Sequence, residues 1–192
     1  MASKPAPSTD EEIRAHTIGE LKPLAAPILL VEHDPEWPER YQREAARIRS
    51  ALGSRTLRVE HGGSTSLPGL AAKPIIDIII EVANSADEGT YAMALEKAGY
   101  VLRMRELEWH EHRMFKGPDT DINLHVYTIG CPEVDRMQAF RNWLRLNEAD
   151  LKLYERAKRD LASRPRKYTQ NYADAKSKVI EIIMARALSS EH

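Results

Sequence analysis

The chain lacks most of the features that would place it in a special structural class. It holds one cysteine, Cys131, so no intramolecular disulfide can form and a cysteine-rich zinc module is excluded. No apolar run approaches the roughly 18–20 residues that a membrane span needs, and the first residues carry no apolar segment typical of a secretion signal. Lysine plus arginine (28) nearly balances aspartate plus glutamate (29), so the composition gives no strong nucleic-acid signal. We therefore expect a cytoplasmic protein.

The sequence divides into regions that differ in composition and periodicity. Residues 1–26 are rich in proline, alanine, serine and charge, and they predict a flexible N-terminal arm with at most a short helix at 10–21. The 192 residues suit one domain. We expect an α+β (α/β-like) domain over residues 27–188, with an α/β core at 27–130 and a helical part at 131–188.

Periodicity and capping residues predict the individual elements. Strands are expected at 28–32, 56–61, 75–82, 100–105, 109–116 and 122–127. Helices are expected at 36–52, 86–98, 133–146, 148–162 and 168–188.

The stretch EHGGSTSLPGLAAKPIIDIIIEV contains a candidate phosphate-binding loop. Gly63 lets the backbone approach a ligand closely, because no Cβ intervenes. Ser64, Thr65 and Ser66 offer hydroxyls and successive amides that can form an anion-binding nest. Lys73 adds a positive charge. The pattern is neither a P-loop nor a dinucleotide fingerprint, and an ordinary turn before a core strand is the alternative.

Asp77 is the one early polar residue in the strongest strand pattern. Strand alternation puts it on the opposite face from the neighbouring isoleucines, together with Ile79 and Glu81. An isolated carboxylate is costly to bury unless it is paired or binds a cation. Asp77 is therefore either a metal-binding or catalytic carboxylate, or a structural residue that accepts hydrogen bonds from neighbouring loop amides or pairs with Lys73 or an arginine. His125 shares its face if the strand at 122–127 lies beside this one.

Two further patterns offer binding residues on the strand expected at 109–116. His110 and His112 point to the same side and can chelate a metal, although so short a pattern also arises by chance. Arg113 can bind a phosphate through two parallel hydrogen bonds.

The last helix is expected to place Tyr168, Tyr172 and Lys176 on one face. Lys176 is predicted to contact a phosphate held by the loop. Solvated helix faces are the alternative explanation for most of the basic residues in this region.

Several motifs, in order, resemble the GrpB family over about residues 27–188. They are HGGSTSLPGLAAKPIIDI, HRMF (112–115), NLHVY (123–127) and FRNWLR (140–145), with Tyr154, Lys158, Tyr172 and Lys176 in the tail. The resemblance implies the nucleotidyltransferase-like fold, a small mixed sheet flanked by helices with a helical C-terminal part. It also implies a nucleoside triphosphate as substrate or ligand, and Mg²⁺ as cofactor.

The chain departs from the superfamily pattern in its acidic residues. That pattern has a glycine–serine pair, then Asp-x-Asp or Asp-x-Glu about a dozen residues on, and a third carboxylate from a later strand. The glycine–serine pair and Asp77 match it. Ile79 stands where the second acid is expected, and the later strand offers Asn123 and His125 instead of the third. Mg²⁺ can still bind through one carboxylate plus substrate phosphates.

Three functional hypotheses follow. In the first, the loop, Lys73 and Arg113 hold the phosphates of a nucleotide, Asp77 binds Mg²⁺, and His125 acts as base or weak ligand in nucleotidyl transfer. In the second, the chain is a catalytically degenerate nucleotide- or phosphometabolite-binding module. It then acts through a partner, and the resemblance implies dephospho-CoA kinase, to which members of the family are joined. The third is a metal-dependent hydrolase built from His110, His112, His125 and Asp77.

Overall fold

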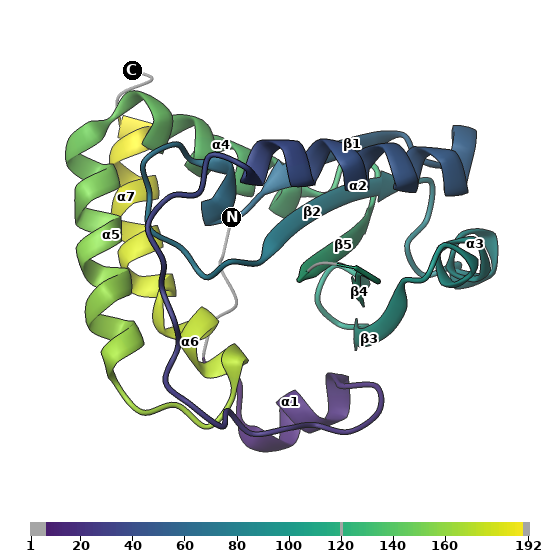
Figure 1. Ribbon diagram of the computed structural model, residues 1–192, viewed down its shortest axis with the longest axis horizontal. Coiled ribbons are helices and arrows are strands. Elements are labelled where there is room, and N and C mark those ends of the chain that lie inside the picture. The colour runs from purple at the N-terminus through teal and green to yellow at the C-terminus, as the bar shows by residue number, and fades with distance from the viewer. Residues whose placement is uncertain (1–6, 120, 190–192) are drawn as a thin grey trace.

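A five-stranded mixed β-sheet forms the centre of the computed structural model, which describes residues 7–119 and 121–189 (Figure 1). The strands are β1 (Arg58–Gly62), β2 (Ile76–Val82), β3 (Val101–Glu106), β4 (His112–Lys116) and β5 (Ile122–Thr128). Their order is β1-β2-β5-β4-β3, with β2 and β5 parallel and the other neighbours antiparallel. The two strands that carry Asp77 and His125 are therefore direct neighbours.

Helices surround the sheet on both sides. The α-helices are α1 (Asp10–His16), α2 (Trp37–Leu52), α3 (Ala92–Lys97), α4 (Pro132–Leu146), α5 (Glu148–Ser163), α6 (Thr169–Ala175) and α7 (Ser177–Ser189). Short 3-10 turns are η1 (Gly53–Arg55), η2 (Ser64–Ser66) and η3 (Glu88–Thr90). This architecture confirms the predicted mixed sheet with flanking helices and a helical C-terminal part.

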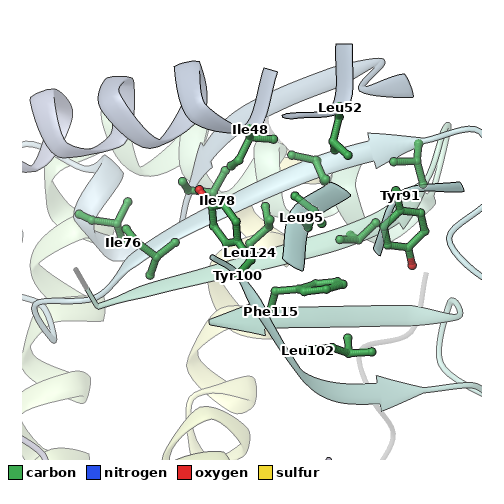
Figure 2. Close-up of a cluster of buried hydrophobic side chains, with 14 of the residues drawn as sticks. Ile48, Leu52, Ile76, Ile78, Tyr91, Leu95, Tyr100, Leu102, Phe115 and Leu124 are labelled. Carbon is green, nitrogen blue, oxygen red and sulfur yellow. The ribbon is translucent and has the colours of Figure 1, made fainter. Parts of the chain in front are cut away.

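The main hydrophobic core lies between the sheet and the helices α2 and α3. In Figure 2, Ile48 of α2 and Leu95 of α3 lie against Ile78 of β2 and Leu124 of β5. All four side chains are fully buried. The apolar face that alternation predicts for β2 is therefore the one that faces this core.

On the opposite face of the sheet, the start of α4 covers a small buried cluster on β2 and β5. Ile79 packs with Tyr127, Cys131 and Val134 where α4 begins. Beyond this cluster, α4, α5 and α7 pack together as a helical group, and α5 and α7 stand at the left of Figure 1. A second core joins this group to the loop after η2; its buried members are Leu67, Leu70, Leu144, Tyr154 and Ile183.

The N-terminal segment lies against the domain along its described part. Ile13 of α1 is 3% exposed, and the Ile18 amide donates to the Arg103 carbonyl at 2.8 Å beside the edge strand β3. Further on, the Leu24 amide donates to the Lys167 carbonyl at 2.8 Å. The mobility expected of residues 1–26 stays a prediction, and residues 1–6 lie outside the described part.

Four predicted elements need correction. The run at 28–32 forms only an isolated bridge between Val31 and Ala72. In place of the helix expected at 86–98, the chain forms the 3-10 turn η3 followed by the short helix α3. The strand expected at 109–116 begins only at His112, because His110 and Glu111 adopt positive φ angles of 55° and 49° in the turn before it.

The helix expected at 168–188 is divided at Lys176 into α6 and α7. Each piece buries a different residue: Tyr172 of α6 lies beside two lysines, whereas Ile183 of α7 enters the second core. No glycine or proline marks this division in the sequence. Among the described helices, none combines the length and the apolar character needed to cross a membrane.

Candidate functional site

The carboxylate of Asp77 lies at the start of β2, directly beside the glycine of the loop. Asn123, its register partner on β5, donates an amide hydrogen bond to Asp77 Oδ1 at 2.8 Å. A Cβ on Gly63 would lie 2.2 Å from Asp77 Oδ2, and the φ of Gly63 is +61°. Both facts require glycine at this position. The side chain of Asp77 is 31% exposed, so one side of the carboxylate remains open.

Only part of the loop is free for a ligand. The Ser66 hydroxyl donates to the Gly63 carbonyl at 2.7 Å, and the Thr65 hydroxyl lies 3.1 Å from His61 Nε2. Both residues are buried. Ser64 is half-buried, and its side chain acts on the buried phenol of Tyr154 in α5, lowering the pKa of that phenol against the effect of burial. The loop therefore offers Gly63 and Ser64 to solvent, while Thr65 and Ser66 hold its shape.

Three lysines from distant parts of the chain gather near Asp77. Lys73 precedes β2, Lys158 comes from α5, and Lys176 stands between α6 and α7. The Nζ atoms of Lys73 and Lys176 lie 5.6 and 4.9 Å from the centroid of the same ring, that of Tyr172. We call Lys73, Asp77, Lys158 and Lys176 the lysine–aspartate cluster.

Lys158 is the most deeply buried member of the cluster. Its side chain is 2% exposed, its Nζ donates to the Ala71 carbonyl at 2.5 Å, and it lies 5.4 Å from the Tyr154 ring centroid. Of the described carboxylates, none forms an ion pair with it. A lysine held in this way keeps its charge at a cost in free energy.

The electrostatics of the cluster follow from burial and from the mixture of charges. Burial, together with the charge of Lys176, lowers the pKa of Lys73 to about 8 and that of Lys158 to about 7. Burial also lowers the pKa of Lys176, and Asp77 opposes this. For Asp77 itself, burial acts to raise the pKa, but the charge of His125 in its protonated form, the hydrogen bond from Asn123 and the charge of Lys73 outweigh it and bring the pKa to about 2. A single carboxylate thus faces three cationic groups.

A chain of hydrogen bonds leads from the cluster into the sheet. His125 Nε2 lies 3.6 Å from Asp77 Oδ1. On the other side of the ring, His125 Nδ1 lies 2.9 Å from His112 Nε2, and His112 Nδ1 lies 2.8 Å from Glu106 Oε2. These residues come from β5, β4 and β3 and share the face of Asp77.

Two candidates are not brought to the cluster. Arg113 points to the opposite face of the sheet, where it is 3% exposed and its Nε donates to Glu88 Oε1 at 2.5 Å. Its position opposite Val126, rather than opposite His125, explains this, since neighbouring strand residues alternate between faces. His110 lies in the turn before β4 and not beside His112 on the strand.

The acidic residues do not fit a metal held by the protein alone. The residue two positions after Asp77 is Ile79, which is 3% exposed under α4. Glu81 is buried and already accepts a hydrogen bond from the Gly130 amide at 2.9 Å. Among the described residues, no group of three or more His, Cys, Asp or Glu side chains is arranged to hold a metal ion. One carboxylate beside three ammonium groups favours an anion over a resident cation.

Sequence reasoning missed several of these relationships. Outside the family likeness, Tyr154 was expected only on the apolar face of its helix and Lys158 only among basic residues on solvated helix faces. The contact of Asn123 with Asp77 was not foreseen. One signal was present: Lys158 follows Leu151 and Tyr154 by seven and four residues, so it interrupts the apolar face of α5. The link between His112 and Glu106 had no sequence signal, because it depends on the register of β3 against β4.

A mixed sheet with a glycine–serine loop that leads to an aspartate on a central strand defines a nucleotidyltransferase-like fold. The GrpB protein family matches residues 27–186. The chain belongs to this family.

Similar proteins agree with this assignment. A UPF0157 protein of Halalkalibacterium halodurans is 58% identical over 186 residues, which are 97% of this chain and 95% of that protein. The crystal structure of the conserved protein GrpB from Enterococcus faecalis is 32% identical, with a TM-score of 0.73, and the match covers 85% of this chain and 99% of that one. A dephospho-CoA kinase of Mycolicibacterium paratuberculosis is 32% identical over 157 residues, 68% of this chain but only 38% of the kinase.

Proposed function

We propose that the protein binds a phosphorylated small molecule, a nucleotide, at the lysine–aspartate cluster beside Gly63 and Ser64. The observation that carries this proposal is the convergence of Lys73, Lys158 and Lys176 around one carboxylate. Three ammonium groups and one carboxylate leave a net positive charge in a partly buried site. Negatively charged phosphate oxygens are the ligand groups that compensate this charge. The buried hydroxyl of Tyr172, which has no hydrogen-bond partner among the described residues, adds a donor beside two of the lysines.

In its finer form, the proposal is nucleotidyl transfer to an acceptor hydroxyl. The hydroxyl oxygen attacks the α-phosphorus, the bond to pyrophosphate breaks, and His125 Nε2 takes the hydroxyl proton. The lysines stabilise the charge on the pyrophosphate that leaves. Mg²⁺ enters this proposal only together with the nucleotide, held by its phosphates, with Asp77 as the one carboxylate within the cluster.

The first prediction concerns Lys176. We expect ATP and pyrophosphate to bind, and Lys176→Met to weaken both by about 10- to 100-fold, because a charge-assisted contact contributes roughly 1.5–3 kcal/mol. Isothermal titration with and without Mg²⁺ measures the change. Lys178→Met is the matched control, since Lys178 is exposed and lies two residues away. Equal affinities in the two variants, or no binding of either probe to the wild type, would contradict the proposal.

The second prediction concerns pH. Because the pKa of Lys158 is about 7 and that of Lys73 is about 8, the cluster loses positive charge as the pH rises through this range. The charge of ATP is nearly constant above about pH 7.5, since its last phosphate group titrates near 6. Its affinity measured in EDTA should therefore fall between about pH 7.5 and 9.5. An affinity that stays level or rises over that interval speaks against lysine-held phosphates.

A second candidate function is a binding module that serves a kinase. It is favoured by the relatives that are named dephospho-CoA kinase, of which this chain matches only a part. In this version the cluster binds the nucleotide or phosphometabolite, and no nucleotidyl group is transferred. Binding of ATP without release of pyrophosphate in the presence of metabolite extracts would favour the module over the transferase.

A further inference from the structure

The two histidines and Glu106 form a chain whose proton positions can be deduced one after another. A carboxylate is a hydrogen-bond acceptor, so the 2.8 Å contact with Glu106 places a proton on His112 Nδ1. Burial lowers the pKa of His112 to about 4, against the opposing effect of Glu106, so this ring is neutral near pH 7. A neutral imidazole has one donor and one acceptor nitrogen. His112 Nε2 is therefore the acceptor.

The same reasoning extends to His125. The 2.9 Å contact between His112 Nε2 and His125 Nδ1 needs one proton, and His112 cannot supply it, so His125 Nδ1 carries it. The two rings are inclined by only 17°, and their centroids are 5.1 Å apart, much farther than the two nitrogens. The rings thus meet edge to edge, the geometry of an in-plane N–H···N bond.

The remaining nitrogen of His125 faces Asp77. Its distance of 3.6 Å from Asp77 Oδ1 is too long for a hydrogen bond, and that oxygen already accepts from Asn123 at 2.8 Å. In a neutral His125 with its proton on Nδ1, Nε2 holds a lone pair on the side of the lysine–aspartate cluster. His125 is 26% exposed, whereas His112 is 3% exposed. The chain thus ends at a proton acceptor that a ligand can reach.

The surroundings of His112 keep this arrangement in place. The Tyr127 ring lies nearly parallel to it at 4.8 Å, and the Trp109 ring meets it edge-on at 5.7 Å. Glu106 is 7% exposed, and its other oxygen, Oε1, lies 3.7 Å from His16 Nδ1 of α1. Packing on both sides of His112 opposes a rotation that would exchange its two nitrogens.

We propose that Glu106 and His112 are positioning residues that fix His125 in the tautomer with its proton on Nδ1, so that Nε2 accepts the proton of a hydroxyl group bound at the cluster. A carboxylate that sets the tautomer of a catalytic histidine is an established device in hydrolytic enzymes. Here the carboxylate acts through a second histidine. The role as a base rests on the proposed nucleotidyl transfer, but the tautomer does not.

Nitrogen NMR of the full chain, labelled with ¹⁵N-histidine, tests the proposal without any substrate. Long-range ¹H–¹⁵N correlation at pH 8 identifies the protonated nitrogen of each ring, and His125→Asn and His112→Phe assign the signals. We expect the proton on Nδ1 in both His112 and His125. His112→Phe removes the acceptor from His125 Nδ1, so the proton of His125 should move to Nε2, on the side of the Asp77 carboxylate.

Two more variants complete the test. Glu106→Leu removes the acceptor from His112 Nδ1 and should reverse the tautomers of both rings, while His110→Asn should leave them as in the wild type. If His112→Phe fails to fold, Glu106→Leu provides the same information. A wild-type His125 with its proton on Nε2 would overturn the proposal, as would an unchanged His125 tautomer in both Glu106→Leu and His112→Phe. An absence of ATP binding would refute the proposed nucleotide site but would leave the NMR result on the tautomers unchanged. Failure of the proposed function and failure of the proposed tautomer are therefore distinguishable.

Discussion

Lys158→Met is expected to stabilise the free protein and to weaken ATP binding by about 10- to 100-fold. Methionine has nearly the length of lysine and is compatible with a helix, so α5 should keep its shape. The substitution removes an ammonium group that is 2% exposed and has no carboxylate partner among the described residues. The same change takes one positive charge from the lysine–aspartate cluster, which lowers its affinity for phosphates.

The sign of the stability change follows from proton linkage. The pKa of Lys158 is about 7 in the folded state, against 10.5 for an unperturbed lysine, so the folded state binds this proton less readily than the unfolded state. The penalty is fully present below about pH 7 and disappears as the pH rises to about 10.5. At pH 7 it amounts to about 4 kcal/mol at most, from roughly 1.4 kcal/mol per pKa unit.

Part of this gain is lost because the Ala71 carbonyl loses its donor, at a cost of about 1–3 kcal/mol. We expect a net increase of about 1–3 kcal/mol in the free energy of unfolding at pH 7, measured by urea denaturation. Lys152→Met, an exposed position on the same helix, should change neither stability nor affinity appreciably. A destabilised Lys158→Met variant, or one that binds ATP as the wild type does, would show that Lys158 is a structural residue.

Ile79→Asp should destabilise the protein by about 3–5 kcal/mol, although it restores the acidic pattern of the superfamily. Position 79 is 3% exposed and packs with Tyr127, Cys131 and Val134 under α4. A carboxylate there is desolvated without a cation, and the isoleucine contacts are lost as well. We expect no gain in Mg²⁺ affinity, because α4 covers the site that a second acid would occupy.

Urea denaturation and calorimetric titration with Mg²⁺ measure these two outcomes. Ile129→Asp is a suitable control, since Ile129 follows β5 but is 50% exposed, and it should change stability by no more than about 0.5 kcal/mol. An Ile79→Asp variant of normal stability that binds Mg²⁺ would mean that this face of β2 still accommodates a metal site.

Much of the fold was predictable because local patterns agree with the final packing. The alternation in β2 correctly separates the core face from the face of Asp77, and the pairing of β2 with β5 brings His125 to the same side, as expected. The single helix expected at 168–188 was wrong because nothing local marks the division at Lys176. The isolated bridge at Val31 shows the same limit, since an apolar run does not by itself provide a partner strand.

The site was less predictable than the fold, because its charges come from different parts of the chain. Gly63, Asp77 and Lys73 belong to one motif and could be proposed together. Lys158 reaches the same place only through the packing of α5 on the loop after η2, with Tyr154 in the second core. Arg113 illustrates the opposite error: its chemistry suits phosphate, but its strand register turns it to Glu88.

The distribution of the lysine–aspartate cluster has a mechanical consequence. Asp77 lies on β2 and Lys73 just before it, whereas Lys158 lies on α5 and Lys176 between α6 and α7. A polyanion held between them would therefore act as a removable tether between the two parts. It would raise the free energy of local opening most for α6 and α7, whose contacts with the rest of the chain depend on few buried side chains. Binding of the ligand would then slow amide hydrogen exchange in α6 and α7.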